Sequence, residues 1–143
     1  MLGGWASPHG GKRQVEFMLD PEFSADFYLA QIVSHYQTRA IDEFLNETER
    51  LGVKIPGIFG VFYYRSASPK TFTMLSKFLP VPVEELQRDF AASVHPEEIC
   101  ALSVHALLQR GAKNIYVSNL PMASATQTFG RIETRVEEMP VVS

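Results

Sequence analysis

The amino-acid sequence predicts an α/β fold built on a parallel sheet, and three observations lead to this prediction. Short segments that are apolar throughout recur along the chain, helical segments with one apolar face separate them, and no linker divides the 143 residues. Segments that are apolar on both faces are typical of a parallel sheet with both sides covered. The length suits one domain with a real core and is too short for two ordinary ones. We therefore treat residues 1–143 as a single domain.

Four segments are predicted to be strands. The clearest run from Phe27 to Val33, from Ile55 to Phe62 and from Asn114 to Ser118, and each is rich in strand-forming residues. The segment from Leu2 to Ala6 is a fourth candidate, already under way at the start of the chain. The predicted strand centres therefore fall near residues 4, 29, 58 and 116.

Helices are predicted between the strands. Thr38 is a suitable N-cap for a helix whose apolar residues recur at three- and four-residue spacing, and Gly52 supplies its stop. Ser68 and Pro69 form an N-cap followed by proline at the first helical position, which predicts another helix start. The remaining helices are predicted over residues 14–19, 82–90, 96–111 and 125–136.

The predicted order of elements implies right-handed crossovers and a parallel sheet, because strands alternate with helices and two helices fill the last gap. A closed (β/α)8 barrel has eight such units in about 250 residues, whereas this chain has four units in 143 residues. From the pattern alone, an open four-stranded α/β sheet and a parallel (β/α) half-barrel, made of four βα units of a TIM-barrel-type fold, fit the sequence equally well.

Composition and charge exclude some classes of partner. Thirteen basic and sixteen acidic side chains give a net charge of -3, and no cluster of Lys and Arg suits the phosphates of a nucleic acid. The longest apolar run, Ile55 to Tyr64, is about half as long as a bilayer span, so we expect no membrane partner. Cys100 is the single cysteine, which indicates a reducing compartment, and the start of the chain does not resemble a secretory leader. We expect a cytoplasmic protein.

The candidate site is predicted at the carboxyl ends of the strands, where parallel sheets bind their ligands. Polar and aromatic residues follow each predicted strand at residues 7–9, 34–36, 63–65 and 119–121. Gln31 lies inside an apolar strand, where an amide without partners costs about 1–3 kcal/mol. It is either a core amide bonded to a neighbouring strand or an amide that binds the edge of a heterocycle. Tyr63, Tyr64 and Arg65 are either a stacking and anion-binding cluster or residues that cap and pack.

Other kinds of site are not predicted. No two histidines have metal-ligand spacing with a supporting carboxylate, so we expect no metal. No glycine-rich phosphate loop follows a strand, and no nucleophilic Ser or Cys motif is present, so we assign no catalytic residue.

Several segments together resemble the methylenetetrahydrofolate reductase family. The segment Ala25 to Gln31 resembles the sixth barrel strand of that family, and Ile55 to Phe59 is similar to its seventh strand with the Pro-Gly-Ile signature. The stretch from Ser76 to Pro82 resembles the helix and "val-pro" step that follow. Gly111 to Asn119 resembles the eighth strand with its terminal Asn, and Leu2 to His9 resembles the fifth. The resemblance covers nearly the whole chain in the correct order.

The resemblance implies the C-terminal half of a barrel, strands five to eight, in an oxidoreductase. Its reaction would reduce 5,10-methylenetetrahydrofolate to the 5-methyl form with NADH or NADPH. Gln31 matches the family glutamine that binds the pterin ring, and Trp5 and His9 match positions that contact the flavin. The further substrate-binding candidates lie at the ends of the third and fourth predicted strands and are Tyr63, Arg65 and Asn119.

Three departures from the family pattern argue against bound FAD. The basic residues that hold the adenylate end of the flavin correspond to the region around Leu19 and Asp20, the arginine after the eighth-strand Asn is Leu120, and residues 62–66 are an insertion. A flavin-independent branch of the family, in which NADH reduces the folate directly, is an alternative that these departures leave open.

The resemblance does not include the first four strands of the family. Those strands supply the glutamate that donates a proton in general acid catalysis, and no residue of this chain matches it. We therefore expect the chain to bind substrate without efficient turnover, and to associate either with itself or with the missing N-terminal half. The alternatives are a non-catalytic half-barrel that binds a pterin or another flat ring, and a truncated structural remnant.

Overall fold

The computed structural model describes residues 1–141 and shows an α/β fold. Its strands are β1 (Gly3–Ala6), β2 (Phe27–Ala30), β3 (Gly57–Phe62) and β4 (Asn114–Ser118). Its helices are α1 (Lys12–Met18), α2 (Thr38–Arg50), α3 (Pro69–Leu75), α4 (Val83–Ala91), α5 (Pro96–Gln109) and α6 (Ala125–Glu138), with short 3-10 turns η1 (Pro8–Gly10), η2 (His35–Gln37) and η3 (Met122–Ser124). None of the helices over residues 1–141 is long and apolar enough to cross a membrane.

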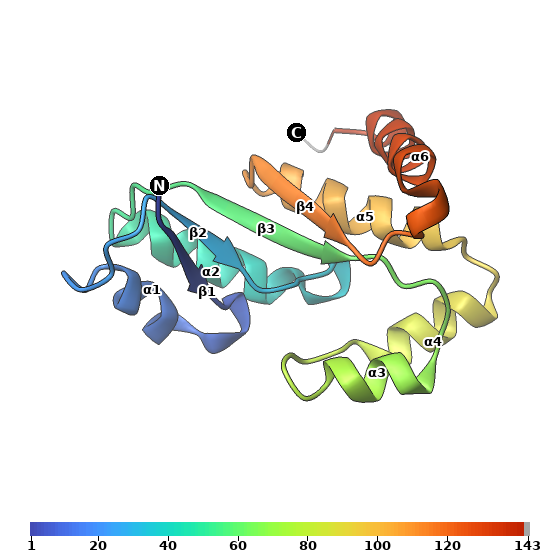
Figure 1. Cartoon of the computed structure of the whole chain (residues 1–143), viewed down its shortest axis with the longest axis horizontal. Helices are drawn as coiled ribbons and strands as arrows, with labels where there is room; N and C mark the ends of the chain where they lie inside the picture. Colours follow the sequence, from blue (N-terminus) through green and yellow to red (C-terminus); the bar gives the residue numbers. More distant parts are fainter. Residues whose placement is uncertain (142–143) are drawn as a thin grey trace.

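The four strands form one parallel sheet in the order β1-β2-β3-β4, which confirms the predicted class (Figure 1). Because each strand pairs with the one before it in the chain, the strand order never reverses. A doubly wound sheet needs such a reversal to place helices on both faces. The arrangement is therefore singly wound, as a half-barrel is.

The core lies between one face of the sheet and the helices α1, α2, α5 and α6. Alternation along the strands directs every second side chain to this face. Its members from the sheet are Ala6, Tyr28, Ala30, Phe59 and Val61. Its members from the helices are Val15, Met18, Ile41, Phe44, Cys100, Ala101, Leu107 and Ile132. Burial in this core raises the pKa of the Cys100 thiol to about 12, so the thiol stays protonated at neutral pH.

The opposite face of the sheet, here named the open face, is largely uncovered. Trp5 is 59% exposed, and Leu29 and Tyr116 are more than a third exposed although all three lie in strands. The Tyr116 ring lies over Gly60, where a Cβ atom would collide with it. By alternation and register, the open face comprises residues 3 and 5 of β1, 27 and 29 of β2 with Gln31 just beyond it, 58, 60 and 62 of β3, and 114, 116 and 118 of β4.

Helices α3 and α4 stand apart from the others, beyond the carboxyl end of β3 (Figure 1). They enclose a second apolar cluster made of Tyr64, Phe72, Leu75, Leu86 and Ile99. The predicted cap is confirmed, since the Ser68 hydroxyl accepts a hydrogen bond from the Thr71 N–H at 3.4 Å. The segment after α3 returns to the sheet, where the carbonyl of Phe78 meets the side chain of Gln31 at 2.6 Å.

Candidate functional site

The candidate site is the carboxyl edge of the sheet, where all four strands end because they are parallel. The structure gathers the candidate residues into two corners of this edge. The corner at β1 and β2 holds Trp5, His9 and Gln31, and the corner at β3 and β4 holds Arg65, Asn119 and the backbone of Tyr63.

Gln31 is the centre of the first corner. Its Oε1 accepts a hydrogen bond from the hydroxyl of Ser7, and its Nε2 donates to the carbonyl of Phe78. The Ser7 oxygen in turn accepts from the backbone N–H of His9 at 3.3 Å. The amide is therefore held in one orientation by groups 24 and 47 residues away in the chain.

The Gln31 amide keeps capacity for a ligand. A glutamine side chain offers two N–H donors and two acceptor lone pairs, and the two bonds described use one of each. The bonds to Ser7 and Phe78 are what a core amide requires. The remaining donor and acceptor, on a side chain only partly buried at the edge of the open face, are what a ring-binding amide requires.

Trp5 and His9 lie at the same corner as this amide. The Trp5 side chain is exposed, whereas the His9 ring is held by a hydrogen bond. Trp5 pairs in register with Leu29 on the open face, and its indole is the single tryptophan of the chain. His9 lies in η1, and its Nε2 donates a hydrogen bond to the carbonyl of Ile32 at 2.8 Å. That bond joins the turn after β1 to the chain after β2, so the imidazole has only Nδ1 left for a ligand.

The second corner is a polar cavity of about 260 Å³. Asn119 adopts a left-handed backbone conformation (φ 68°), and its Nδ2 donates to the carbonyl of Tyr63 at 3.0 Å. Arg65 donates to the carbonyls of Asn119 and Leu120, each at 3.3 Å. The cavity is lined by Arg65, Ser66, Ser68, Thr71 and Asn119. It combines one guanidinium with hydroxyl and amide groups, a set that suits an anion or a carboxylate.

The side chain of Tyr63 lies on the other side of the sheet. Its ring is buried in the main core, and this burial is the main reason that the pKa of its phenol is raised. Tyr63 reaches the second corner through its backbone carbonyl, which accepts the hydrogen bond from Asn119.

The sequence reasoning placed Ser7 at the carboxyl edge without assigning it a role, and it missed Tyr116. Ser7 directly follows a strand, which places it at the ligand-binding edge, but its bond to Gln31 spans 24 residues. Tyr116 lies on the open face between the two corners, and its hydroxyl points at the Ala30 carbonyl at 3.5 Å. The available signal for Tyr116 was its alternation with Ile115 and Val117, whose side chains pack on the helix side.

The strand residues of the open face offer hydrogen-bonding groups and aromatic rings but no charged side chain. Among the strand residues of this face, which the structure describes in full, none is Asp, Glu, Lys, Arg or His. Partial burial raises the pKa of the Tyr116 phenol, so it stays protonated at neutral pH and serves as a donor. No family model matches the chain, and no curated protein does either.

Proposed function

We propose that this chain binds the pterin ring of a reduced folate at the open face, beside Gln31. The observation that carries the proposal is the Gln31 amide, held in a fixed orientation at the carboxyl edge with a donor and an acceptor left for a ligand. A pterin is flat and has donors and acceptors paired along one edge, so an oriented amide suits it. Trp5 and Tyr116 supply exposed aromatic surface on the same face for ring contacts.

The second corner suits the other end of a folate. The carboxylates of its glutamate tail match the guanidinium of Arg65 and the amide of Asn119, which line one polar cavity. In this proposal Gln31 orients the ring and Arg65 and Asn119 hold the tail.

The resemblance to methylenetetrahydrofolate reductases extends the proposal to a reaction. The chain would be the folate-binding half of a (β/α)8 barrel that reduces 5,10-methylenetetrahydrofolate with NADH or NADPH. Flavin is left out, because Leu19 and Asp20 stand where the family has the basic residues for its phosphates. The strand residues of the open face include no carboxylic acid to protonate the reacting nitrogen, so a partner half would supply that group.

The same observation favours a second candidate, a non-catalytic half-barrel that binds a pterin or another flat ring. The two candidates differ in turnover. Consumption of NADH that depends on methylenetetrahydrofolate, by the chain alone or with an added N-terminal half of a barrel, supports the oxidoreductase. Binding of folate without any such consumption supports the non-catalytic candidate.

Binding is tested by calorimetric titration of 5-methyltetrahydrofolate, with the fluorescence of Trp5 as a second readout on the same face. Gln31→Leu should weaken binding by about tenfold or more, because it removes a hydrogen-bonded contact to the ring. Gln37→Leu is the matched control. The Gln37 Nε2 donates to the Pro80 carbonyl at 2.7 Å, so this variant also loses a bond to the segment after α3, but outside the open face. Equal affinity of the two variants would sink the assignment of Gln31.

A further inference from the structure

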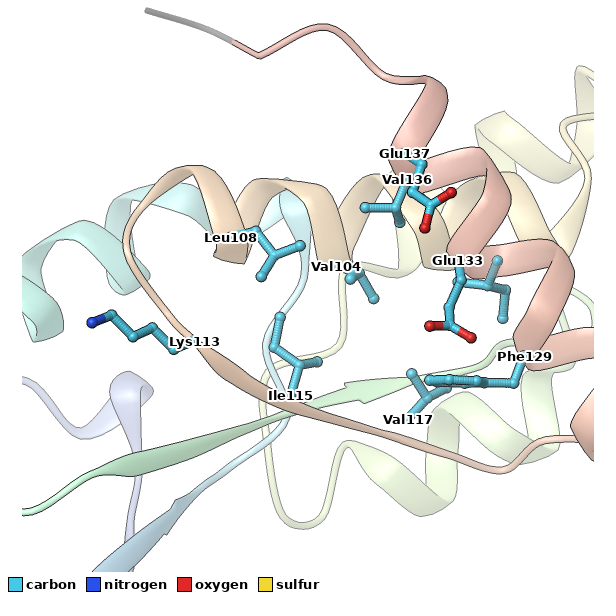
Figure 2. A pocket seen from close by; sticks show the side chains of 10 residues that line it. Val104, Leu108, Lys113, Ile115, Val117, Phe129, Glu133, Val136 and Glu137 are labelled. Carbon is cyan, nitrogen blue, oxygen red and sulfur yellow. The ribbon is translucent and has the colours of Figure 1, made fainter.

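An apolar groove lies beside β4, between this strand and the helices α5 and α6, on the side of the sheet opposite the open face. Its cavity has a volume of about 290 Å³, close to the lower end of the range of about 300–1,000 Å³ that is usual for small-molecule sites. Figure 2 shows its side chains extending from the three elements toward a common space. The residues that line it are Val104, Leu108, Lys113, Ile115, Val117, Phe129, Ile132, Glu133, Val136 and Glu137.

The apolar part of this lining is only partly covered by the protein itself. Leu108 is 43% exposed and Phe129 is 39% exposed. Ile115 and Val117 pack against the main core without being fully buried. A ligand with an apolar body of matching size would remove these side chains from water, and burial of apolar surface favours binding. The groove therefore suits a small molecule that is largely hydrocarbon.

The charges of the groove indicate which end group such a molecule should carry. Glu133 and Glu137 both line the groove and lie one turn apart on α6, a spacing at which like charges repel each other. The arginines of the same helix do not neutralise them, because Arg131 and Arg135 form their ion pairs with glutamates of α5. Over residues 1–141, neither carboxylate has an ion-pair partner.

The basic residue of the lining does not offset these carboxylates. Lys113 lies just before β4, and Figure 2 shows its side chain pointing away from α6, whereas Glu133 extends from α6 toward β4 beside the ring of Phe129. A cation at that position would meet a carboxylate and an aromatic ring, and both groups attract ammonium ions. The α6 side of the groove is therefore complementary to a positive charge.

We propose that this groove binds a small organic amine, with its apolar body over Ile115 and Val117 and its ammonium group between Glu133 and Glu137. The ammonium donates hydrogen bonds to the carboxylates and lies near the ring of Phe129. An acid of the same shape is disfavoured, because its carboxylate would meet two like charges. This site lies on the other side of the sheet from the one proposed for folate, so the two proposals stand or fall separately.

The probe is 4-phenylbutylamine, with 4-phenylbutanol as its neutral analogue and 4-phenylbutyrate as the acid. In NMR titrations of the whole chain at neutral pH, the amine should bind about tenfold more tightly than the alcohol, because a charge-assisted hydrogen bond is stronger than a neutral one. The amide signals that shift should be those of β4, α5 and α6. Glu133→Gln and Glu137→Gln should each weaken binding of the amine by about threefold or more, and leave binding of the alcohol unchanged.

Glu138→Gln is the matched control, because Glu138 is an exposed glutamate of α6 that does not line the groove. Each of the three changes removes one negative charge, so a general attraction of the amine to an acidic protein would fall equally in all of them. Equal losses would therefore overturn the proposal. So would tighter binding of the alcohol or the acid, or no binding of the amine at about 10 mM, tenfold above a Kd that is already weak. Urea unfolding of each variant checks that the fold is retained.

Discussion

At the residue scale, three helices end in the same way but with different residues. The second residue beyond α2, α4 and α5 has a positive φ in each case, and it is Gly52 (71°), Ser93 (61°) and Gly111 (93°). The two glycines were predicted as helix stops, because glycine adopts this conformation without a steric penalty. The sequence does not predict a helix stop at Ser93, because serine rarely adopts a positive φ. Its left-handed conformation occurs where α4 ends.

Ser93→Gly should therefore stabilise the protein by about 0.5–1 kcal/mol, since relief of the left-handed strain exceeds the entropic cost of glycine. Gly52→Ala is the opposite change at the equivalent position of α2 and should destabilise by about 1–2 kcal/mol. Chemical denaturation of both variants measures the difference. A destabilised Ser93→Gly protein would show that the Ser93 conformation is supported by interactions other than helix termination.

Gln31 shows how far the sequence leads at this scale. An amide inside an apolar segment was the signal that selected it, and the structure does place it at the carboxyl edge. Its hydrogen-bond partners Ser7 and Phe78 could not be predicted from the sequence, because they lie in other segments and no local pattern links them to Gln31.

At the scale of elements, β1, β2 and β3 are shorter than the apolar segments that predicted them, whereas β4 has the predicted bounds. The segment predicted to Val33 leaves the sheet after Ala30, and the segment predicted from Ile55 enters at Gly57. Hydrophobic residues continue past the strand because Val33 packs in the core beyond the end of the strand. An apolar pattern shows which residues are buried. It does not show where the strand ends, because a residue buried in a loop gives the same pattern.

The contact between α5 and α6 depends on a buried carboxylate. Glu97, in the first turn of α5, accepts a hydrogen bond from Arg131 of α6 at 2.7 Å, and Arg135 approaches it at 3.7 Å. Glu97→Ala should destabilise by about 1–2 kcal/mol, less than a fully buried pair, because the arginines remain in contact with water. Glu98→Ala, which loses a more exposed partnership with Arg135, should cost less than about 1 kcal/mol. Equal effects of the two substitutions in thermal unfolding would contradict this ranking.

The contact between η2 and α5 makes stability depend on pH. Burial lowers the pKa of the His35 imidazole below its ordinary value of 6.5, against a smaller opposing effect of Asp89. The neutral ring fits its site, since its Nδ1 lies 2.8 Å from the hydroxyl of Ser103. The unfolded chain therefore takes up the proton first, so this contribution is fully present above pH 6.5 and is lost as the pH falls toward the folded-state pKa.

Unfolding by urea between pH 8 and pH 5.5, a range that spans the ordinary histidine pKa of about 6.5, should show a declining free energy of unfolding. His35→Gln should flatten that decline, because it removes the titrating imidazole from its contact with Ser103. A wild-type slope that persists in His35→Gln would assign the effect to another group.

At the scale of the whole molecule, the sequence predicted the class of fold, and the parallel sheet confirms it. The predicted order of elements placed two helices in the last gap, whereas the structure has three there, α3, α4 and α5. The prediction left an open sheet and a half-barrel equally compatible, because strand order is decided by pairings between distant segments. The groove beside β4 and the place of α3 and α4 were likewise not predicted, since they follow from how helices pack after the sheet has formed.

The pairing of each strand with its predecessor also has a consequence for folding. β1 can pair before β4 is formed, because β1 and β4 are not paired with each other within one chain. Each strand, with the helix that follows it, can pack on the strand that formed before it. The entropic cost of each pairing is therefore that of closing one strand–helix connection. A chain leaving the ribosome can therefore assemble its sheet progressively from the N-terminus, with the β4 edge appearing last.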